Sequence, residues 1–232
     1  MIQTDSIRGE VLLVANPISG WGKVARHLAE VIAALEGRGL NVTTCETRGP
    51  GDARRAAAGF AGDLILSFGG DGTFNEVLNG AELGRCALSV IPAGTGNVLA
   101  KELGVPGSPR RAVDVLMRGK VIDFDVGLAG NHRFACIFGA GMDAHIVRVV
   151  HEGREGNLTQ LHYVPILLRQ TLRPPRWGIN VEIEGEPFVE DVNVACVGNT
   201  RSYGGPIELT SAAAPTDGQL DVAVTRVRSP RE

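Results

Sequence analysis

The sequence predicts a two-part α/β fold, with a parallel sheet covered by helices followed by an antiparallel, β-sandwich-like region. Strand and helix signals alternate as far as about residue 120. Such alternation is typical of a parallel sheet with helices on both faces. Beyond residue 120, strand signals follow one another across short turns, which is typical of antiparallel pairing. We therefore expect a first domain over residues 1–120 and a β-rich second domain over residues 121–232.

The elements of the first domain follow from short apolar segments and helical spacing. Val24, Leu28, Val31 and Leu35 recur on one helical face, and glycines at 37 and 39 stop that helix. Strands of a parallel sheet end at a common edge, so the loops that follow them should gather there. The expected strands are 11–15, 41–47, 64–68 and 87–91, and the expected helices are 24–35, one from Ala53, 73–78, 98–103 and 109–117.

The second domain reads mainly as strands, with two helical stretches. One helical stretch follows Met142, and the other covers residues 161–172. The turn signal Gly130-Asn131-His132 separates two of the strands, and Gly185 marks a further hairpin. The expected strands are 121–128, 133–138, 178–183, 190–197 and 219–227.

Composition narrows the classes of protein that fit. The chain has 232 residues and a net charge of −3, which argues against nucleic acid as the main partner. Its four cysteines are scattered without metal-site spacing, so we expect free thiols in the core. We expect no signal peptide, and the sequence has no apolar run of the ~18 residues that a membrane span needs. We expect a cytoplasmic protein with peripheral membrane contact at most; a homodimer is compatible with this sequence.

The most informative segment runs from Gly69 through Gly70, Asp71 and Gly72 to Thr73, directly after an apolar strand. Residues without a Cβ let backbone N–H groups approach a ligand closely. A helix that opens at Thr73 would aim its unpaired N–H groups and its positive dipole end at the same point, which suits a phosphate. A bare carboxylate would repel phosphate, so Asp71 fits best if it faces Mg²⁺ or water held by Mg²⁺.

Further loops extend this pattern in a fixed order. Asn16-Pro17-Ile18-Ser19-Gly20, Gly69–Asn75 and Pro92-Ala93-Gly94-Thr95-Gly96-Asn97 each follow a strand. Tyr203-Gly204-Gly205 and Asp217-Gly218-Gln219-Leu220 come later. With these loops the chain resembles the diacylglycerol kinase catalytic family, which includes bacterial lipid kinases, sphingosine kinases and ceramide kinases. The resemblance covers nearly the whole chain from about Val11.

The resemblance implies an α/β nucleotide-binding domain joined to a β-sandwich, with ATP in the cleft between them. Asp71 would be the catalytic residue, with its carboxylate directed at the catalytic Mg²⁺. The residues that would bind the nucleotide come from four successive loops: Asn16, Pro17, Ser19, Gly20, Thr47, Gly69, Gly70, Asp71, Gly72, Thr73, Asn75 and Thr95.

The second domain carries two further expected sites. Asp217 resembles the acid of a family loop that holds a structural Mg²⁺, together with two backbone carbonyls, here those of Ala214 and Gln219. The alternative is an Asp-Gly turn that needs no metal. Asp143 resembles the position at which sphingosine kinases hold the lipid hydroxyl, and a helix N-cap is the alternative.

The functional hypothesis is an ATP- and Mg²⁺-dependent kinase that phosphorylates a lipid alcohol such as diacylglycerol. Family members continue into a return segment with an Asp-Gly-Glu motif, whose Glu is the proposed general base, and the sequence ends at Glu232 before such a motif. One alternative, favoured by the absence of this motif, is a catalytically impaired nucleotide-binding remnant of the fold. A second alternative is a soluble small-molecule kinase related to NAD kinases.

Residues 148–176 combine basic and apolar side chains. Five arginines against two glutamates give the stretch a local positive charge, although the whole chain is acidic. Such a composition suits an anionic membrane surface. The alternative is a helix packed on the second domain with a solvated basic face.

Overall fold

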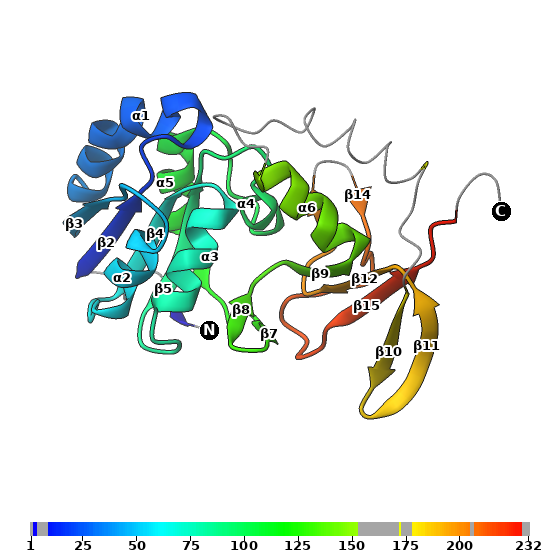
Figure 1. Cartoon of the computed structure of the whole chain (residues 1–232). Helices are drawn as coiled ribbons and strands as arrows, with labels where there is room; N and C mark the ends of the chain where they lie inside the picture. Colours follow the sequence, from blue (N-terminus) through cyan, green and yellow to red (C-terminus); the bar gives the residue numbers. More distant parts are fainter. Residues whose placement is uncertain (1, 4–8, 153–171, 173–177, 205–206, 229–232) are drawn as a thin grey trace. The chain divides into compact units, whose positions relative to one another are not determined.

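The computed structural model describes residues 2–3, 9–152, 172, 178–204 and 207–228 and divides the chain into two compact units (Figure 1). The first unit comprises Met1–Ala135 with Pro215–Asp217, and the second comprises Cys136–Ala214 with Gly218–Glu232. The first unit therefore continues past residue 120, where the sequence pattern changes.

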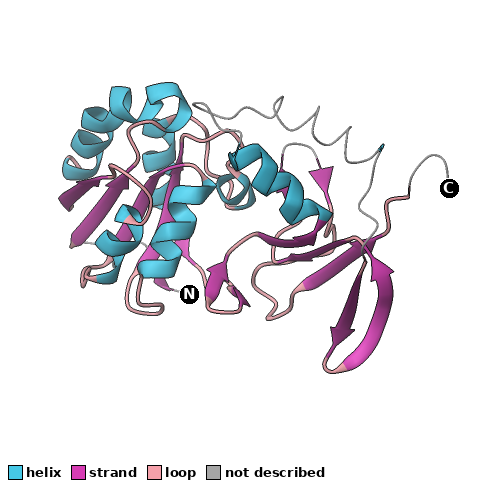
Figure 2. Ribbon diagram, in the orientation of Figure 1, coloured by secondary structure: helices cyan, strands magenta, loops and turns pink. Residues whose placement is uncertain are grey.

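The first unit is built on a four-stranded parallel sheet, drawn in magenta in Figure 2. The strand order is β3-β2-β4-β5, with the labels given in Figure 1. In this order Leu13 of β2 lies between Thr44 of β3 and Leu66 of β4. The parallel sheet and the antiparallel sheets of the second unit confirm the predicted fold class. The strands are β2 (Glu10–Ala15), β3 (Asn41–Glu46), β4 (Leu64–Gly69) and β5 (Ala87–Pro92).

Helices cover both faces of this sheet. On one face, Leu12 and Ile65 pack with Ala57 of α2 and Val77 of α3 into a buried cluster. Every residue of β4 is buried, as expected of a strand covered on both faces. The helices of the first unit are α1 (Ser19–Glu36), α2 (Asp52–Ala58), α3 (Asp71–Gly80), α4 (Val98–Glu102) and α5 (Pro109–Arg118).

Two helices begin two or more residues earlier than the sequence pattern predicts. Helix α3 begins at Asp71 rather than Thr73, because the extended Gly70 already serves as its N-cap. Helix α1 is assigned from Ser19, but Gly20, Trp21 and Gly22 have left-handed backbone angles and form a separate turn ahead of the regular helix.

The prediction of one strand over 121–128 was wrong. Only β6 (Lys120–Val121) and β7 (Gly127–Ala129) are strands, and the N–H of Asp125 between them donates to the carbonyl of Pro215 at 2.8 Å. Strand β6 pairs with β1 (Ile2–Gln3), and β7 pairs with β8 (His132–Phe134).

The β7–β8 hairpin is fastened to the end of α3, which explains why it belongs to the first unit. The backbone N–H of Arg133 donates to Asn79 Oδ1 at 2.8 Å, and Asn79 Nδ2 donates to the Arg133 carbonyl at 2.9 Å. The Arg133 guanidinium also donates to the carbonyls of Leu78 and Ala81, at 3.0 and 2.8 Å. A cation at the C-terminus of a helix satisfies unpaired carbonyls and complements the helix dipole.

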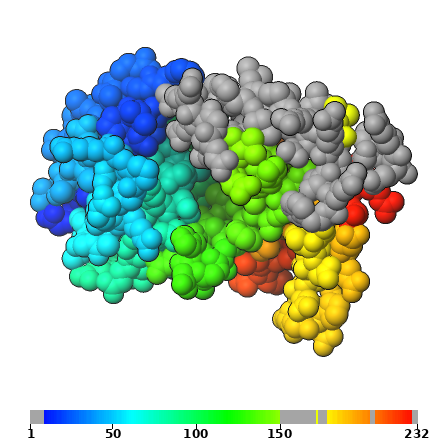
Figure 3. Space-filling model, in the orientation of Figure 1, coloured from blue at the N-terminus to red at the C-terminus, as the bar shows by residue number. Residues whose placement is uncertain are grey.

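The second unit contains a three-stranded antiparallel sheet in the order β15-β12-β9, beside α6 (Met142–Glu152). The hairpin of β10 and β11, yellow in Figure 3, projects from the body of this unit. The strands are β9 (Ile137–Gly141), β10 (Ile179–Ile183), β11 (Glu186–Val192), β12 (Val194–Gly198), β13 (Ser202–Gly204), β14 (Ile207–Glu208) and β15 (Asp221–Thr225).

The single strand predicted over 190–197 is also two strands, separated at Asn193. This side chain is 1% exposed, and its amide pairs with Val227: Nδ2 donates to the Val227 carbonyl and Oδ1 accepts the Val227 N–H, both at 2.8 Å. A buried amide with such partners is well satisfied and fixes a break between strands that alternation alone does not reveal.

We predict that Arg133→Ala lowers the free energy of unfolding by about 2 kcal/mol, because two hydrogen bonds from a charged donor to the α3 carbonyls are lost. Urea unfolding followed by tryptophan fluorescence measures the change. Arg111→Ala, at an exposed position of α5, is the control and should change stability by less than about 0.5 kcal/mol. Equal effects of the two variants would contradict the assigned role.

Candidate functional site

The turn between β4 and α3 presents the N-terminus of a ten-residue helix at the carboxyl edge of the sheet. A Cβ at Gly69 would lie 2.6 Å from Thr73 Oγ1, so this turn closes only with glycine there. A Cβ at Gly72 would meet nothing within 4 Å, so open space adjoins the first turn of α3. The N-terminus of a helix with open space beside it suits an anion such as phosphate.

The loop after β5 lies directly against this turn. A Cβ at Gly94 would lie 2.6 Å from Gly70 Cα, and the N–H of Ala93 donates to the Gly69 carbonyl at 2.7 Å. Within the loop, Asn97 has left-handed backbone angles and its Nδ2 donates to the Gly94 carbonyl at 2.7 Å. Backbones this close require residues without side chains, so the two glycine loops form one contiguous surface.

The loop after β2 joins the same group. Asn16 Nδ2 donates to Thr73 Oγ1 at 3.3 Å, which links the first loop to α3. Gly20 has φ of +59°, and a Cβ there would lie 2.0 Å from the Ala93 carbonyl oxygen. The structure thus brings together the residues that the sequence placed in three separate loops.

The loop after β3 is held at this edge as well. The N–H of Thr47 donates to the Ala15 carbonyl at 2.8 Å, which keeps Thr47 beside the end of β2. Glu76 Oε2 of α3 accepts the N–H of Gly51 at 3.0 Å. Glu76 follows the glycine-rich motif on the same helix, which was the available sign of its role, but sequence reasoning did not assign it one.

The other residues predicted to bind the nucleotide lie on the same loops or on α3, and they differ in solvent exposure. Pro17 and Ser19 are partly buried, and the Ser19 N–H donates to the Asn16 carbonyl at 3.0 Å. Asn75 is exposed on α3, and Thr95 is exposed in the loop after β5.

The carboxylate of Asp71 contacts the start of α4. Its Oδ1 accepts the N–H of Leu99 at 3.3 Å. Burial raises the pKa of Asp71, and the backbone amides of Leu99, Val98 and Asn97 act in the opposite direction. A Cβ at Gly96 would lie 3.0 Å from Oδ2, so a side chain at this position would crowd the second oxygen. Carboxylate oxygens are hard ligands of the kind that Mg²⁺ accepts.

Lys23 is a second residue that the sequence did not single out. Its ammonium donates to the carbonyls of Pro92, at 3.4 Å, and Gly107. Burial lowers its pKa. Lys23 therefore ties the start of α1 to the end of β5.

In the second unit, Asp143 lies in the first turn of α6. Its Oδ1 accepts a hydrogen bond from the hydroxyl of Tyr203. Burial raises the pKa of Asp143, while the hydrogen bond from Tyr203 lowers it. Tyr203 belongs to one of the sequence motifs, but the sequence alone assigned it no role.

The residues predicted for the structural Mg²⁺ are divided between the units. Asp217 belongs to the first unit and is exposed, whereas Ala214 and Gln219 belong to the second. Among the described residues, no group of three or more His, Cys, Asp or Glu side chains could hold a metal ion. A site with one carboxylate and backbone carbonyls remains a prediction. All four cysteines carry free thiols, and Cys196 alone is buried.

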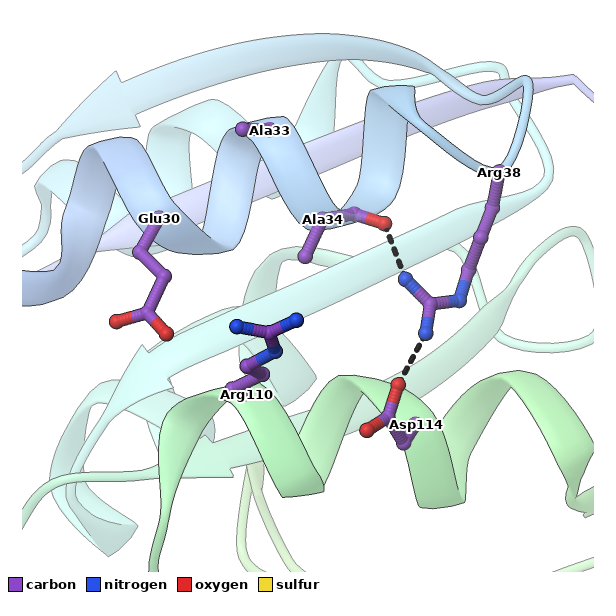
Figure 4. Close-up of a pocket in the computed structure, with 6 residues that line it drawn as sticks. All are labelled: Glu30, Ala33, Ala34, Arg38, Arg110 and Asp114. Atoms are coloured by element: carbon purple, nitrogen blue, oxygen red, sulfur yellow. Dashed lines mark hydrogen bonds and ion pairs between the residues drawn. The ribbon is translucent and has the colours of Figure 1, made fainter.

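A cavity of about 340 Å³ lies between α1 and α5 (Figure 4). Arg38 spans it, donating to Asp114 and to the Ala34 carbonyl. Two acids and two arginines line this cavity, so its charges largely compensate, and it contains none of the predicted site residues. Its lining is Glu30, Ala33, Ala34, Arg38, Arg110 and Asp114.

Most of the predicted lipid-facing segment, 148–176, lies outside the described residues. Within the part of the chain that the structure describes, no helix is both long and apolar enough to cross a bilayer.

Comparison with known proteins identifies the family. Residues 10–129 match the diacylglycerol kinase catalytic domain, and residues 136–232 match the YegS C-terminal NAD kinase beta sandwich-like domain. The chain belongs to the diacylglycerol kinase catalytic family, as the loops predicted.

Individual relatives agree with this assignment. A diacylglycerol kinase of Bacillus subtilis is 33% identical over 92% of this chain and 73% of its own length. One from Mycobacterium tuberculosis is 31% identical over 94% of this chain and 74% of its own length. A crystal structure of a diacylglycerol kinase from Bacillus anthracis superposes with a TM-score of 0.74 at 28% identity, covering 94% of this chain and 74% of that one.

We predict that Gly94→Ala lowers the free energy of unfolding by about 1–3 kcal/mol, because the added methyl overlaps the Gly70 backbone and forces the two loops apart. Gly107→Ala is the matched control, since a Cβ there meets nothing within 4 Å. Thermal unfolding of both variants measures the difference. A Gly94→Ala variant as stable as the control would show that the loops do not need this close approach.

Proposed function

We propose that this chain is an ATP- and Mg²⁺-dependent kinase that phosphorylates a lipid alcohol such as diacylglycerol. The observation that carries the proposal is the meeting of the loops after β2, β4 and β5 at the N-terminus of α3. The relatives named diacylglycerol kinase support the choice of a lipid alcohol as acceptor.

The backbone of the first unit suits a polyphosphate. Gly70 and Gly94 bring two backbones together, and Gly72 leaves space beside the start of α3. Amides and a helix N-terminus favour negative charge without the cost of ordering long side chains. Phosphoryl transfer depends mainly on such positioning and on charge neutralisation.

Asp71 is the residue that we propose to hold Mg²⁺, directly or through water. When bound, Mg²⁺ would neutralise charge on the transferring phosphate. The contact of Asp71 with the Leu99 N–H holds the carboxylate at one place against α4. In the second unit, we assign Asp143 to accept a hydrogen bond from the lipid hydroxyl, and an anionic membrane surface is the proposed source of the substrate.

The test is phosphate transfer from radiolabelled ATP, with Mg²⁺, to diacylglycerol in mixed micelles. We expect labelled lipid from the unmodified protein and a loss of about 100-fold or more in Asp71→Asn, since the variant loses the charge that holds the ion. Asp123→Asn removes an exposed acid of the same unit and should retain full activity.

Each other outcome contradicts a named part of the proposal. Label in a soluble acceptor such as NAD, and none in lipid, would favour the NAD kinase-like alternative. Nucleotide binding by calorimetry without transfer to any acceptor would favour a remnant of the fold. Full transfer by Asp71→Asn would remove Asp71 from the site.

A further inference from the structure

The second unit holds a partly buried carboxylate whose surroundings come from three other elements. Asp143 lies on α6, Tyr203 on β13, Cys196 on β12 and Gly139 on β9. Strand β12 pairs with β9 so that Cys196 is opposite Gly139. The register of this strand pair therefore places Gly139 and Cys196 side by side next to the Asp143 side chain.

One oxygen of the carboxylate accepts a hydrogen bond, and the other packs against backbone. Oδ1 accepts the hydrogen bond from the Tyr203 hydroxyl. Oδ2 fills the space beside Gly139, where a Cβ would lie only 1.6 Å from it. A side chain at 139 would displace the carboxylate, so glycine is required at 139 for this orientation.

The charge state of Asp143 depends on a small number of described neighbours. Burial raises its pKa, and the hydrogen bond from Tyr203 opposes that rise. The thiol of Cys196 has its pKa raised to about 11 by burial and by the charge of Asp143, so it stays neutral at neutral pH. Among the described residues, Tyr203 is thus the donor that favours the ionised carboxylate.

An ionised carboxylate can accept about four hydrogen bonds. Tyr203 supplies one within the described residues, and a partly buried carboxylate is costly unless its remaining capacity finds donors. The hydroxyl of an alcohol can donate a hydrogen bond to this carboxylate and use part of that capacity.

We propose that Tyr203 is a positioning residue, which holds the Asp143 carboxylate in one orientation so that it accepts a hydrogen bond from the substrate alcohol. The inference rests on the proposed function for its ligand. The coupling of Tyr203 to Asp143 is a property of the ligand-free protein and is measured without any substrate.

The first test follows the carboxyl carbon of Asp143 by NMR during a pH titration of the ligand-free protein. Tyr203→Phe removes only the donating hydroxyl, so the pKa of Asp143 should rise. Ser211→Ala, which removes an exposed hydroxyl of the same unit, should leave the titration unchanged. An unchanged titration in folded Tyr203→Phe would overturn the inference.

The second test uses lipid phosphorylation kinetics. In Tyr203→Phe we expect kcat/KM for the lipid to fall by about 10-fold, as for loss of a residue that orients a contacting group, with KM for ATP unchanged. The acidic limb of the pH profile should move to higher pH, because a higher pKa leaves less Asp143 ionised at a given pH. A purely structural loss would lower the rate at every pH and leave this limb in place, which would contradict the inference.

A double-mutant cycle adds a third readout. In an Asp143→Asn background, Tyr203→Phe should cost little more, because the carboxylate that it positions is gone. Additive losses would contradict the inference. If the unmodified protein transfers no phosphate to lipid, the proposed function fails, and the NMR titration still decides whether Tyr203 controls Asp143.

Discussion

The contact between the glycine backbones at 70 and 94 is the constraint on which the first unit's site depends. A Cβ added at Gly94 would lie only 2.6 Å from Gly70 Cα, and one added at Gly70 would lie 3.2 Å from Gly94 Cα, so a side chain at 94 would force the two loops apart. This contact sets the spacing between the start of α3 and the loop that leads to α4. Across this spacing, the Asp71 carboxylate accepts a hydrogen bond from the Leu99 N–H. The Asn16 side chain, from the loop after β2, donates to the Thr73 hydroxyl.

Other contacts of the first unit hold this edge in place. Strand β4 is buried throughout, so the turn that follows it begins from a fixed point. Glu76 and Lys23 tie neighbouring loops to this edge by hydrogen bonds to backbone groups. At the C-terminal end of α3, the Arg133 guanidinium donates to backbone carbonyls, and its charge complements the helix dipole. The positive end of the same dipole lies at the N-terminus, where we propose that phosphate binds.

The sequence predicted the elements of the sheet more reliably than their interruptions. The alternation of apolar strands and helices, and the glycine loops after them, indicated the parallel sheet and the edge at which its loops meet. The breaks at residues 122–126 and at Asn193 escaped notice, because each depends on a hydrogen bond to a residue far along the chain. The roles of Lys23 and Glu76 were missed for a related reason: each binds a main-chain group of a residue far along the chain, and side-chain patterns do not identify such a partner.

By itself, the sequence determined the family, the fold class and the order of the loops, because these follow from local patterns of apolar residues, glycines and acids. Only the tertiary structure decided which atoms those residues meet. The contact of Asp71 with the amides of α4, and that of Asp143 with Tyr203, join residues distant in sequence. Their partners depend on strand register and on close backbone approach, which exist only once the chain has folded.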